Sequence, residues 1–122
     1  MSKTTTPYWN VMAEENESEW EEIPGAEGQM WQLTLAMDEE TGDYTRLTRF
    51  AAGANTRAAG VKKLDYPEEM YVLSGKLFDE TVETWIEAGH YVSRPPFEPY
   101  GPFLCAEECV ILEISYPGQA RK

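Results

Sequence analysis

The segment Pro67-Glu-Glu-Met-Tyr-Val-Leu-Ser-Gly-Lys-Leu-Phe-Asp79 is the part of this chain that decides its expected fold. The apolar stretch Met70–Leu73 is typical of a short strand, and Ser74-Gly75 closes that strand with a turn. Lys76–Asp79 continues after the turn as a second strand. The segment therefore predicts two short strands near the middle of the chain.

Upstream, the sequence predicts a β-hairpin. Apolar residues alternate with others from Trp31 to Met37, which indicates a half-buried strand. The turn Asp38–Asp43 places Gly42 where a left-handed backbone is needed. Tyr44–Phe50 then resumes as a strand rich in β-forming residues, so the two strands should pair.

Downstream, strands are expected over 81–86 and 90–94, followed by a rigid proline loop over 95–102. Cys109–Tyr116 is the strongest strand in the chain, with Val110, Leu112, Ile114 and Tyr116 on one face and Ile111 and Glu113 on the other. Short strands about ten residues apart, with glycine and proline between them and no convincing long helix, predict an all-β sandwich or barrel.

Length and charge restrict the function classes. The chain has 122 residues, which suits one domain, and its 22 acidic against 10 basic residues give a formal net charge of −12. A surface of that sign disfavours nucleic-acid and anionic-membrane partners. No apolar run is long enough for a membrane span, and the first residues lack an apolar signal core, so a cytoplasmic location is expected.

Residues 1–20 are predicted to be an acidic arm, 21–118 the domain and 119–122 a short tail. Six glutamates fall between Glu14 and Glu22, although the tryptophans and other apolar residues of the arm allow parts of it to dock. Cys105 and Cys109 are interpreted as reduced thiols; a redox pair or half a metal site is the alternative.

Four segments together resemble the cupin superfamily, specifically the short cupins akin to the C-terminal domain of ChrR-type anti-sigma factors and to acetylacetone-cleaving dioxygenases. They are Asp43–Ala54, Pro67–Asp79, Ala88–Pro96 and Glu107–Ile114, in the order and spacing of that family. The likeness covers roughly residues 20 to 116. It implies a single RmlC-like jelly-roll β-barrel, which by analogy with the family forms a homodimer.

The resemblance also implies a metal site, which this chain lacks in its motif positions. Counting back seven residues from Gly75 puts Glu68 at the carboxylate ligand of the first motif. The two histidine positions hold either Val61 and Lys63 or Lys62 and Leu64, depending on register. In the second motif, which begins at Gly89, Tyr100 replaces the last histidine. Because one carboxylate and a phenol hold Fe²⁺ poorly, no metal cofactor is expected.

The predicted chemistry is that of a metal-independent lyase, isomerase or hydrolase acting on a small carbonyl-bearing or aromatic molecule. Its candidate catalytic residues are Glu68, Lys63, Tyr100 and His90. Its candidate substrate-binding residues are Arg57, Lys62, Met70, Arg94 and Phe97. A carboxylate beside an ammonium or phenol can accept a proton while an oxyanion is stabilised.

Three alternatives stay open. The lysine and Glu68 either take part in catalysis as an acid–base pair or form only a structural ion pair that fills the former metal site. The cupin is an enzyme or a non-catalytic module that binds or senses a small molecule. A dioxygenase with an unusual metal site that uses His90 and Glu68 is the third possibility.

Overall fold

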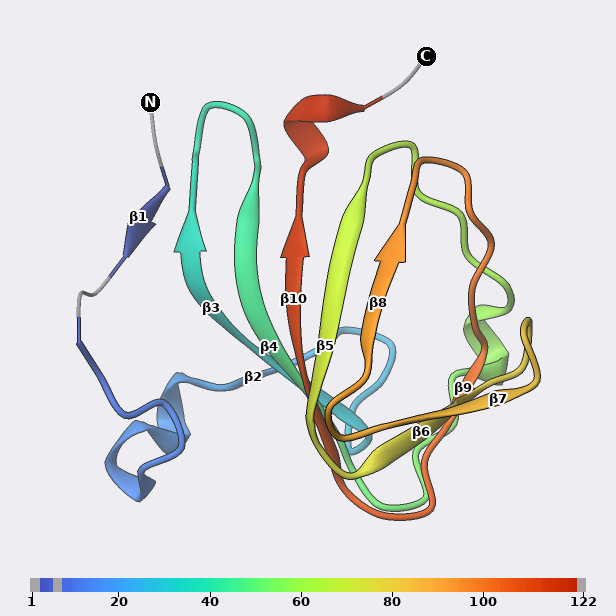
Figure 1. Cartoon of the computed structure of the whole chain (residues 1–122). Coiled ribbons are helices and arrows are strands. Elements are labelled where there is room, and N and C mark those ends of the chain that lie inside the picture. Colours follow the sequence, from blue (N-terminus) through green and yellow to red (C-terminus); the bar gives the residue numbers. More distant parts are fainter. Residues whose placement is uncertain (1–2, 6–7, 121–122) are drawn as a thin grey trace.

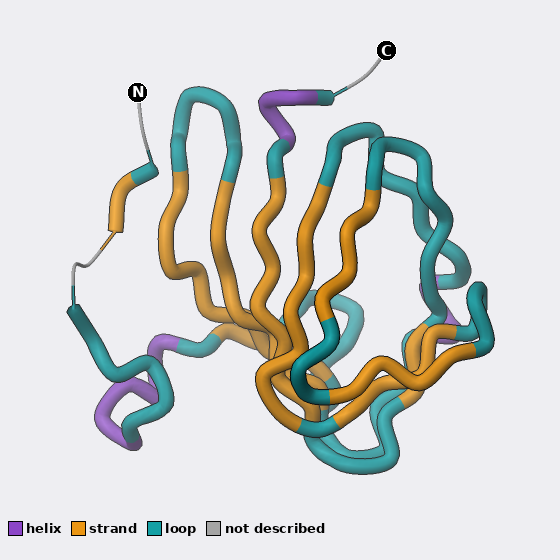
Figure 2. The backbone as a smooth tube through the Cα atoms, in the orientation of Figure 1, coloured by secondary structure: helices purple, strands orange, loops and turns teal. Residues whose placement is uncertain are grey.

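Strands make up nearly all the regular structure of the chain, and the computed structural model describes residues 3–5 and 8–120 (Figure 1). The strands are β1 (Thr4–Thr5), β2 (Glu21–Glu22), β3 (Met30–Met37), β4 (Tyr44–Phe50), β5 (Glu68–Ser74), β6 (Lys76–Asp79), β7 (Thr84–Glu87), β8 (Tyr91–Arg94), β9 (Phe103–Leu104) and β10 (Cys109–Ser115). Helical structure in the described residues is confined to the short 3₁₀ turns η1 (Glu14–Glu19), η2 (Arg57–Ala59) and η3 (Pro117–Gln119) (Figure 2). The predicted all-β class is confirmed.

Two antiparallel sheets form the barrel. The larger sheet has the strand order β1-β3-β4-β10-β5-β8, with β2 paired to β3, and the smaller sheet has the order β7-β6-β9. Figure 1 shows the smaller sheet lying across one end of the larger one. The predicted strand Cys109–Tyr116 holds the central place in the larger sheet, because Leu112 of β10 lies opposite Leu47 of β4 and Tyr71 of β5.

The local predictions around the two tight turns are confirmed. The hairpin of β3 and β4 forms with Gly42 at φ +82°. Gly75 (φ +72°) carries the chain from the larger sheet to the smaller one, and a Cβ atom there would come within 2.1 Å of the carbonyl oxygen of Glu108. Only glycine fits this turn, since both the backbone angle and the space exclude a side chain.

Two strands begin later than predicted. The strand expected over 81–86 is β7 (Thr84–Glu87), because residues 80–83 form the turn that follows β6. The strand expected over 90–94 is β8 (Tyr91–Arg94), because His90 still belongs to the preceding turn.

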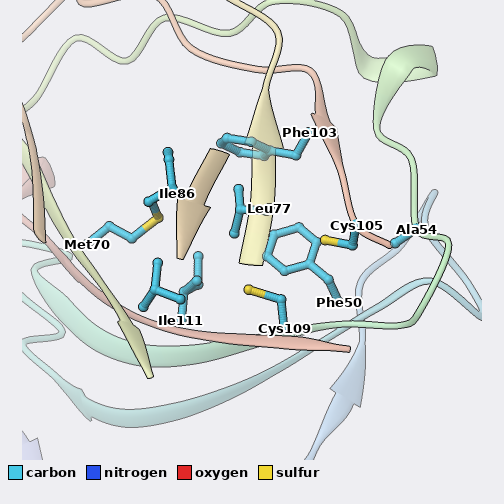
Figure 3. Close-up of a cluster of buried hydrophobic side chains, with 10 residues drawn as sticks. Phe50, Ala54, Met70, Leu77, Ile86, Phe103, Cys105, Cys109 and Ile111 are labelled. Carbon is cyan, nitrogen blue, oxygen red and sulfur yellow. The ribbon is translucent and has the colours of Figure 1, made fainter. Parts of the chain in front are cut away.

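The inward faces of the two sheets enclose an apolar cluster at one end of the barrel. Figure 3 shows Leu77 and Ile86 of the smaller sheet facing Met70 and Ile111 of the larger sheet. Cys105 and Cys109 lie in the same cluster as buried free thiols. The close packing of these side chains is the main source of hydrophobic stabilisation inside the barrel.

A second apolar cluster covers the outer face of the larger sheet. Leu33, Leu47 and Val110 pack there against Trp20, which is 7 % exposed. Trp9 and Val11 pack against the same cluster, so part of the acidic segment 1–20 docks on the sheet. The apolar alternation from Trp31 onward is thus buried by the N-terminal segment and leaves the opposite face of β3 to line the interior.

Within residues 3–5 and 8–120, no helix is long and apolar enough to cross a membrane.

Candidate functional site

A pocket of about 430 Å³ occupies the end of the barrel that the apolar cluster leaves unfilled. Its wall is the inward face of β3, β4, β5, β8 and β10. The remaining sides are lined by residues 23–26, by residues 55, 56 and 58–60 around η2, and by Tyr100, Gly101 and Phe103. The site is therefore built on rigid strands and bordered by loops.

The first buried ion pair of the pocket joins neighbouring strands. Glu68 of β5 and Arg94 of β8 lie directly opposite each other in the register of the larger sheet. Arg94 Nη1 donates to Glu68 Oε1 at 3.1 Å, and Ser115 Oγ of β10 donates to the other carboxylate oxygen at 2.7 Å. The side chains of Arg94 and Glu68 are 7 % and 4 % exposed. Both oxygens of this buried carboxylate are thus hydrogen-bonded.

The second pair lies on β4 and β10. Arg46 Nε is 3.4 Å from Glu113 Oε1, and Thr48 Oγ1 donates a short hydrogen bond to the same oxygen. Arg46 Nη1 also donates to Gln32 Oε1 at 3.0 Å. Burial by itself would lower the pKa of Arg46, but the charge and hydrogen bond of Glu113 together with Tyr44 and Glu68 outweigh it and leave that pKa raised.

Tyr100 forms part of the wall beside Arg94. The Arg94 guanidinium lies 4.2 Å from the centre of the Tyr100 ring, which in turn stacks on Phe103. Tyr100 exchanges two backbone hydrogen bonds with Lys62, of 2.9 and 3.0 Å, and these hold the proline-rich loop against the segment before β5. Burial, reinforced by the charge of Glu68, raises the pKa of Tyr100, so its phenol stays protonated and can donate.

Glu68 has an unusually high affinity for a proton. Burial raises its pKa above the ordinary value of 4.5, and the neighbouring carboxylate of Glu113 raises it further. The hydrogen bond from Ser115 and the charges of Arg94 and Arg46 act in the opposite direction without reversing the shift. A carboxyl group with a raised pKa is a stronger base than an exposed one, which is the property that a proton-accepting group needs.

The structure brings five of the residues predicted for the site to this pocket: Glu68, Lys62, Met70, Arg94 and Tyr100. Glu68 was expected to pair with a lysine. Its cationic partner is Arg94, because the pairing of β5 with β8 puts the guanidinium directly across from it, whereas Lys62 sits at an exposed position of the pocket border.

The other four predicted residues do not line the pocket. Lys63 is exposed, and Arg57 points away to form an exposed ion pair with Glu80 at 2.7 Å. His90 lies in the turn before β8, where its Nδ1 is 3.0 Å from the backbone nitrogen of Glu87. Phe97 is 53 % exposed. His90 and Glu68 are therefore not assembled into one site.

The sequence did not reveal the second ion pair of the pocket, Arg46 with Glu113, or the hydroxyl groups of Thr48 and Ser115 that donate to the two carboxylates. The usable signal was the alternation along β10, which places Glu113 on the same face as the buried Ile111. The assignment of that face to the interior required the position of the N-terminal segment, which covers the other one.

The residues present do not suit the metal implied by the family resemblance. Each pocket carboxylate already faces a guanidinium, which opposes a second cation electrostatically. Within the described part of the chain, no group of three or more His, Cys, Asp or Glu side chains is arranged to hold a metal ion. The imidazole ligands that bind such a metal best are also missing from the pocket wall.

Comparison with known proteins agrees with this architecture. The family model described as "ChrR Cupin-like domain" matches residues 10–117. No curated protein matches.

Solved structures of similar fold include three of note. An RmlC-like cupin from Shewanella frigidimarina has 18 % identity and a TM-score of 0.72, over 96 % of this chain and 95 % of its own. An acetylacetone dioxygenase from Acinetobacter johnsonii has 16 % identity and a TM-score of 0.72, over 93 % of this chain and 75 % of its own. The Rhodobacter sphaeroides complex of SigE with the anti-sigma ChrR contains a chain with 18 % identity and a TM-score of 0.60. The match covers 79 % of this chain and 47 % of that one. At these identities the likeness establishes the fold.

Proposed function

The chain belongs to the ChrR cupin-like domain family, and we propose that its pocket acts on a small organic molecule without a metal, with Glu68 as the group that accepts a proton. The observation that carries this proposal is a buried carboxylate with a raised pKa in the wall of a pocket of about 430 Å³. A cavity of that size holds a small organic ligand.

The proposed chemistry is proton transfer next to a carbonyl group. Glu68 would accept a proton from the carbon beside the carbonyl, and the electron pair of the broken C–H bond would move onto the carbonyl oxygen. Arg94 and Tyr100 supply donors for that developing oxyanion. Return of the proton to another atom completes an isomerisation, and loss of a leaving group from the next carbon completes a lyase reaction.

A second candidate is a pocket that binds a small molecule without changing it. The observation in its favour is that both oxygens of Glu68 already accept hydrogen bonds, from Arg94 and from Ser115. These two hydrogen bonds fix the carboxylate as the partner of Arg94 and Ser115, which is the arrangement expected of a group that shapes the pocket without reacting.

Isotope exchange distinguishes the two candidates. Ketones and β-dicarbonyl compounds are incubated with the protein in D₂O, and loss of the proton signal next to the carbonyl is followed by NMR. We expect exchange faster than in a protein-free control with wild type and with Glu69→Gln, whose side chain lies on the outer face, and only the protein-free rate with Glu68→Gln. Binding of these compounds without exchange would favour the second candidate, a pocket that binds a small molecule without changing it.

Metal independence has its own test. Elemental analysis of protein purified without added metal should find no stoichiometric Fe, Mn, Ni or Zn, and a chelator should leave the exchange rate unchanged. A stoichiometric metal would contradict this part of the proposal.

We also propose that the chain forms a homodimer. β8 is an edge strand of the larger sheet, and Tyr91 on it lies opposite Tyr71 of β5, with both rings largely exposed on the outer face. Exposed edges and apolar patches favour association. Light scattering after size-exclusion chromatography should give twice the chain mass of 13.9 kDa.

A further inference from the structure

One nitrogen of Arg94 has no hydrogen-bond partner. Nη1 is bonded to Glu68, whereas Nη2 is buried and unpaired, the one such side-chain atom among the described residues. A buried donor on a charged group is costly to leave without an acceptor. Because Arg94 belongs to the pocket wall, a ligand oxygen is a suitable acceptor.

The charges around the pocket favour an anion. The charged residues that line it are the cations Arg46, Lys62 and Arg94 and the carboxylates Glu68 and Glu113, which leaves one positive charge uncompensated. The whole chain, by contrast, carries a formal net charge of −12. The excess positive charge attracts an anion to the pocket, whereas the negative surface of the protein repels anions elsewhere.

The remaining wall is apolar. Phe50, Met70 and Ile111 line the deeper part of the pocket and continue into the apolar cluster of the barrel. They offer contact area to the hydrocarbon or aromatic body of a ligand. The wall therefore combines a charged recognition group with an apolar surface.

We infer that the ligand of this pocket is an organic monocarboxylate with an apolar or aromatic body, whose carboxylate accepts a hydrogen bond from Nη2 of Arg94. This inference rests on the proposed function, because it names the ligand class of the same pocket. One negative charge balances the charged lining residues, whereas a dianion would exceed them. The Tyr100 ring holds the guanidinium plane in place, and a fixed guanidinium suits a planar carboxylate.

Matched pairs of probes test the charge requirement. Benzoate and benzamide, 3-phenylpropionate and 3-phenylpropanamide, and hexanoate and hexanamide differ within each pair mainly in charge. Their binding to the full chain is measured by calorimetry and by the shift of the Arg94 side-chain resonances in ¹H–¹⁵N spectra. We expect at least one carboxylate to bind about tenfold or more tightly than its amide, which is the ratio expected for one charge-assisted hydrogen bond.

Variants locate the effect. Arg94→Lys keeps the positive charge but removes the Nη2 donor, so it should abolish most of the preference for the carboxylate. Should this variant fail to fold, the double variant Arg94→Met with Glu68→Leu removes both charges of the pair and should show no preference. Lys76→Met, which removes a cation outside the pocket, should retain the wild-type ratio.

Three results would overturn the inference. The first is that the amides bind as tightly as the carboxylates, and the second is that neither member of any pair binds. The third is a carboxylate preference that survives the loss of Arg94. Each of these leaves the proposed function intact if neutral ketones still exchange protons in a Glu68-dependent manner, and the two proposals fail together only if that exchange is absent as well.

Discussion

The two ends of the barrel interior share strands β4, β5 and β10 and differ in chemistry. Along β10 the inward residues change from Cys109 and Ile111 to Glu113 and Ser115. Along β4 they change in the opposite chain direction from Phe50 to Arg46, because the two strands are antiparallel. One end is a close-packed apolar core, and the other is a pocket lined by ion pairs.

The two ends contribute differently to stability. Apolar burial stabilises the fold, whereas a buried ion pair gains little over well-packed apolar residues of similar volume. The barrel would be at least as stable with apolar residues at both ends. The charged end is thus what the proposed ligand pocket requires rather than what the fold requires, and variants at each end should have distinguishable consequences.

The largest effect on stability is expected when one member of the Arg94–Glu68 ion pair is removed and the other is left. Arg94→Met leaves Glu68 buried without its cation and should cost about 3–5 kcal/mol of unfolding free energy at pH 7. Arg94→Met combined with Glu68→Leu should recover most of that loss or exceed wild-type stability. Urea denaturation of the three proteins measures this, and a double variant no more stable than the single one would show that the pair stabilises the fold.

A slightly smaller effect is expected at the apolar end. Leu77 is completely buried between the sheets, so Leu77→Ala should cost about 2–5 kcal/mol by lost burial and the cavity left behind. Leu73→Ala is the matched control, because Leu73 is 45 % exposed. Carboxylate binding should survive in Leu77→Ala at temperatures where it is folded. Loss of binding in the folded variant would mean that the two ends are not independent.

The strands were the part of the fold that sequence patterns predicted well. Strands such as Tyr44–Phe50 and Lys76–Asp79 have the predicted bounds because alternation and turn residues are local signals. Family spacing also located Glu68 and Tyr100 on one pocket.

The partners of these residues could not be predicted, because they depend on contacts between distant segments. Alternation shows that Ile111 and Glu113 share a face, but the inward direction of that face depends on the N-terminal segment that covers Val110. Similarly, Arg94 pairs with Glu68 only because β8 lies next to β5 in a particular register. A lysine near in sequence was therefore a poorer candidate than an arginine 26 residues away.

The pH dependence of stability gives a smaller effect that sharpens the comparison. The folded protein holds the Glu68 proton above the ordinary pKa of 4.5, where the unfolded chain has lost it. Stability from this group therefore falls as the pH rises from about 4.5 through the raised pKa. Each pH unit over which only the folded state holds the proton is worth about 1.4 kcal/mol.

Glu68→Gln removes this titration, so the stability of wild type relative to the variant should decrease as the pH rises in that range. Urea unfolding at a series of pH values from 4 to 8 measures the difference, and subtraction cancels the titration of the other carboxylates. A difference independent of pH would contradict the raised pKa of Glu68.

The smallest effect, of opposite sign, is expected from the next residue in the chain. Glu69 points to the outer face of β5, where Tyr116 donates to one carboxylate oxygen at 2.6 Å and Tyr91 to the other at 2.7 Å. These hydrogen bonds, that from Tyr116 first, lower the pKa of Glu69. Its contribution to stability is present above pH 4.5 and is lost as the pH falls through the lowered pKa.

Because Glu69 is only half-buried, on the outer face of the sheet, Glu69→Gln should change stability by less than about 1 kcal/mol. The stability of wild type relative to the variant should increase as the pH rises towards 4.5. The same urea series, extended to pH 3, compares it with Glu68→Gln. Opposite slopes for two adjacent carboxylates would show that the face of the sheet sets the sign of the pKa shift. Slopes of the same sign would mean that the hydrogen bond from Ser115 and the charges of Arg94 and Arg46 outweigh the burial of Glu68, so that Glu68 is a stabilising ion-pair partner and a poor proton acceptor.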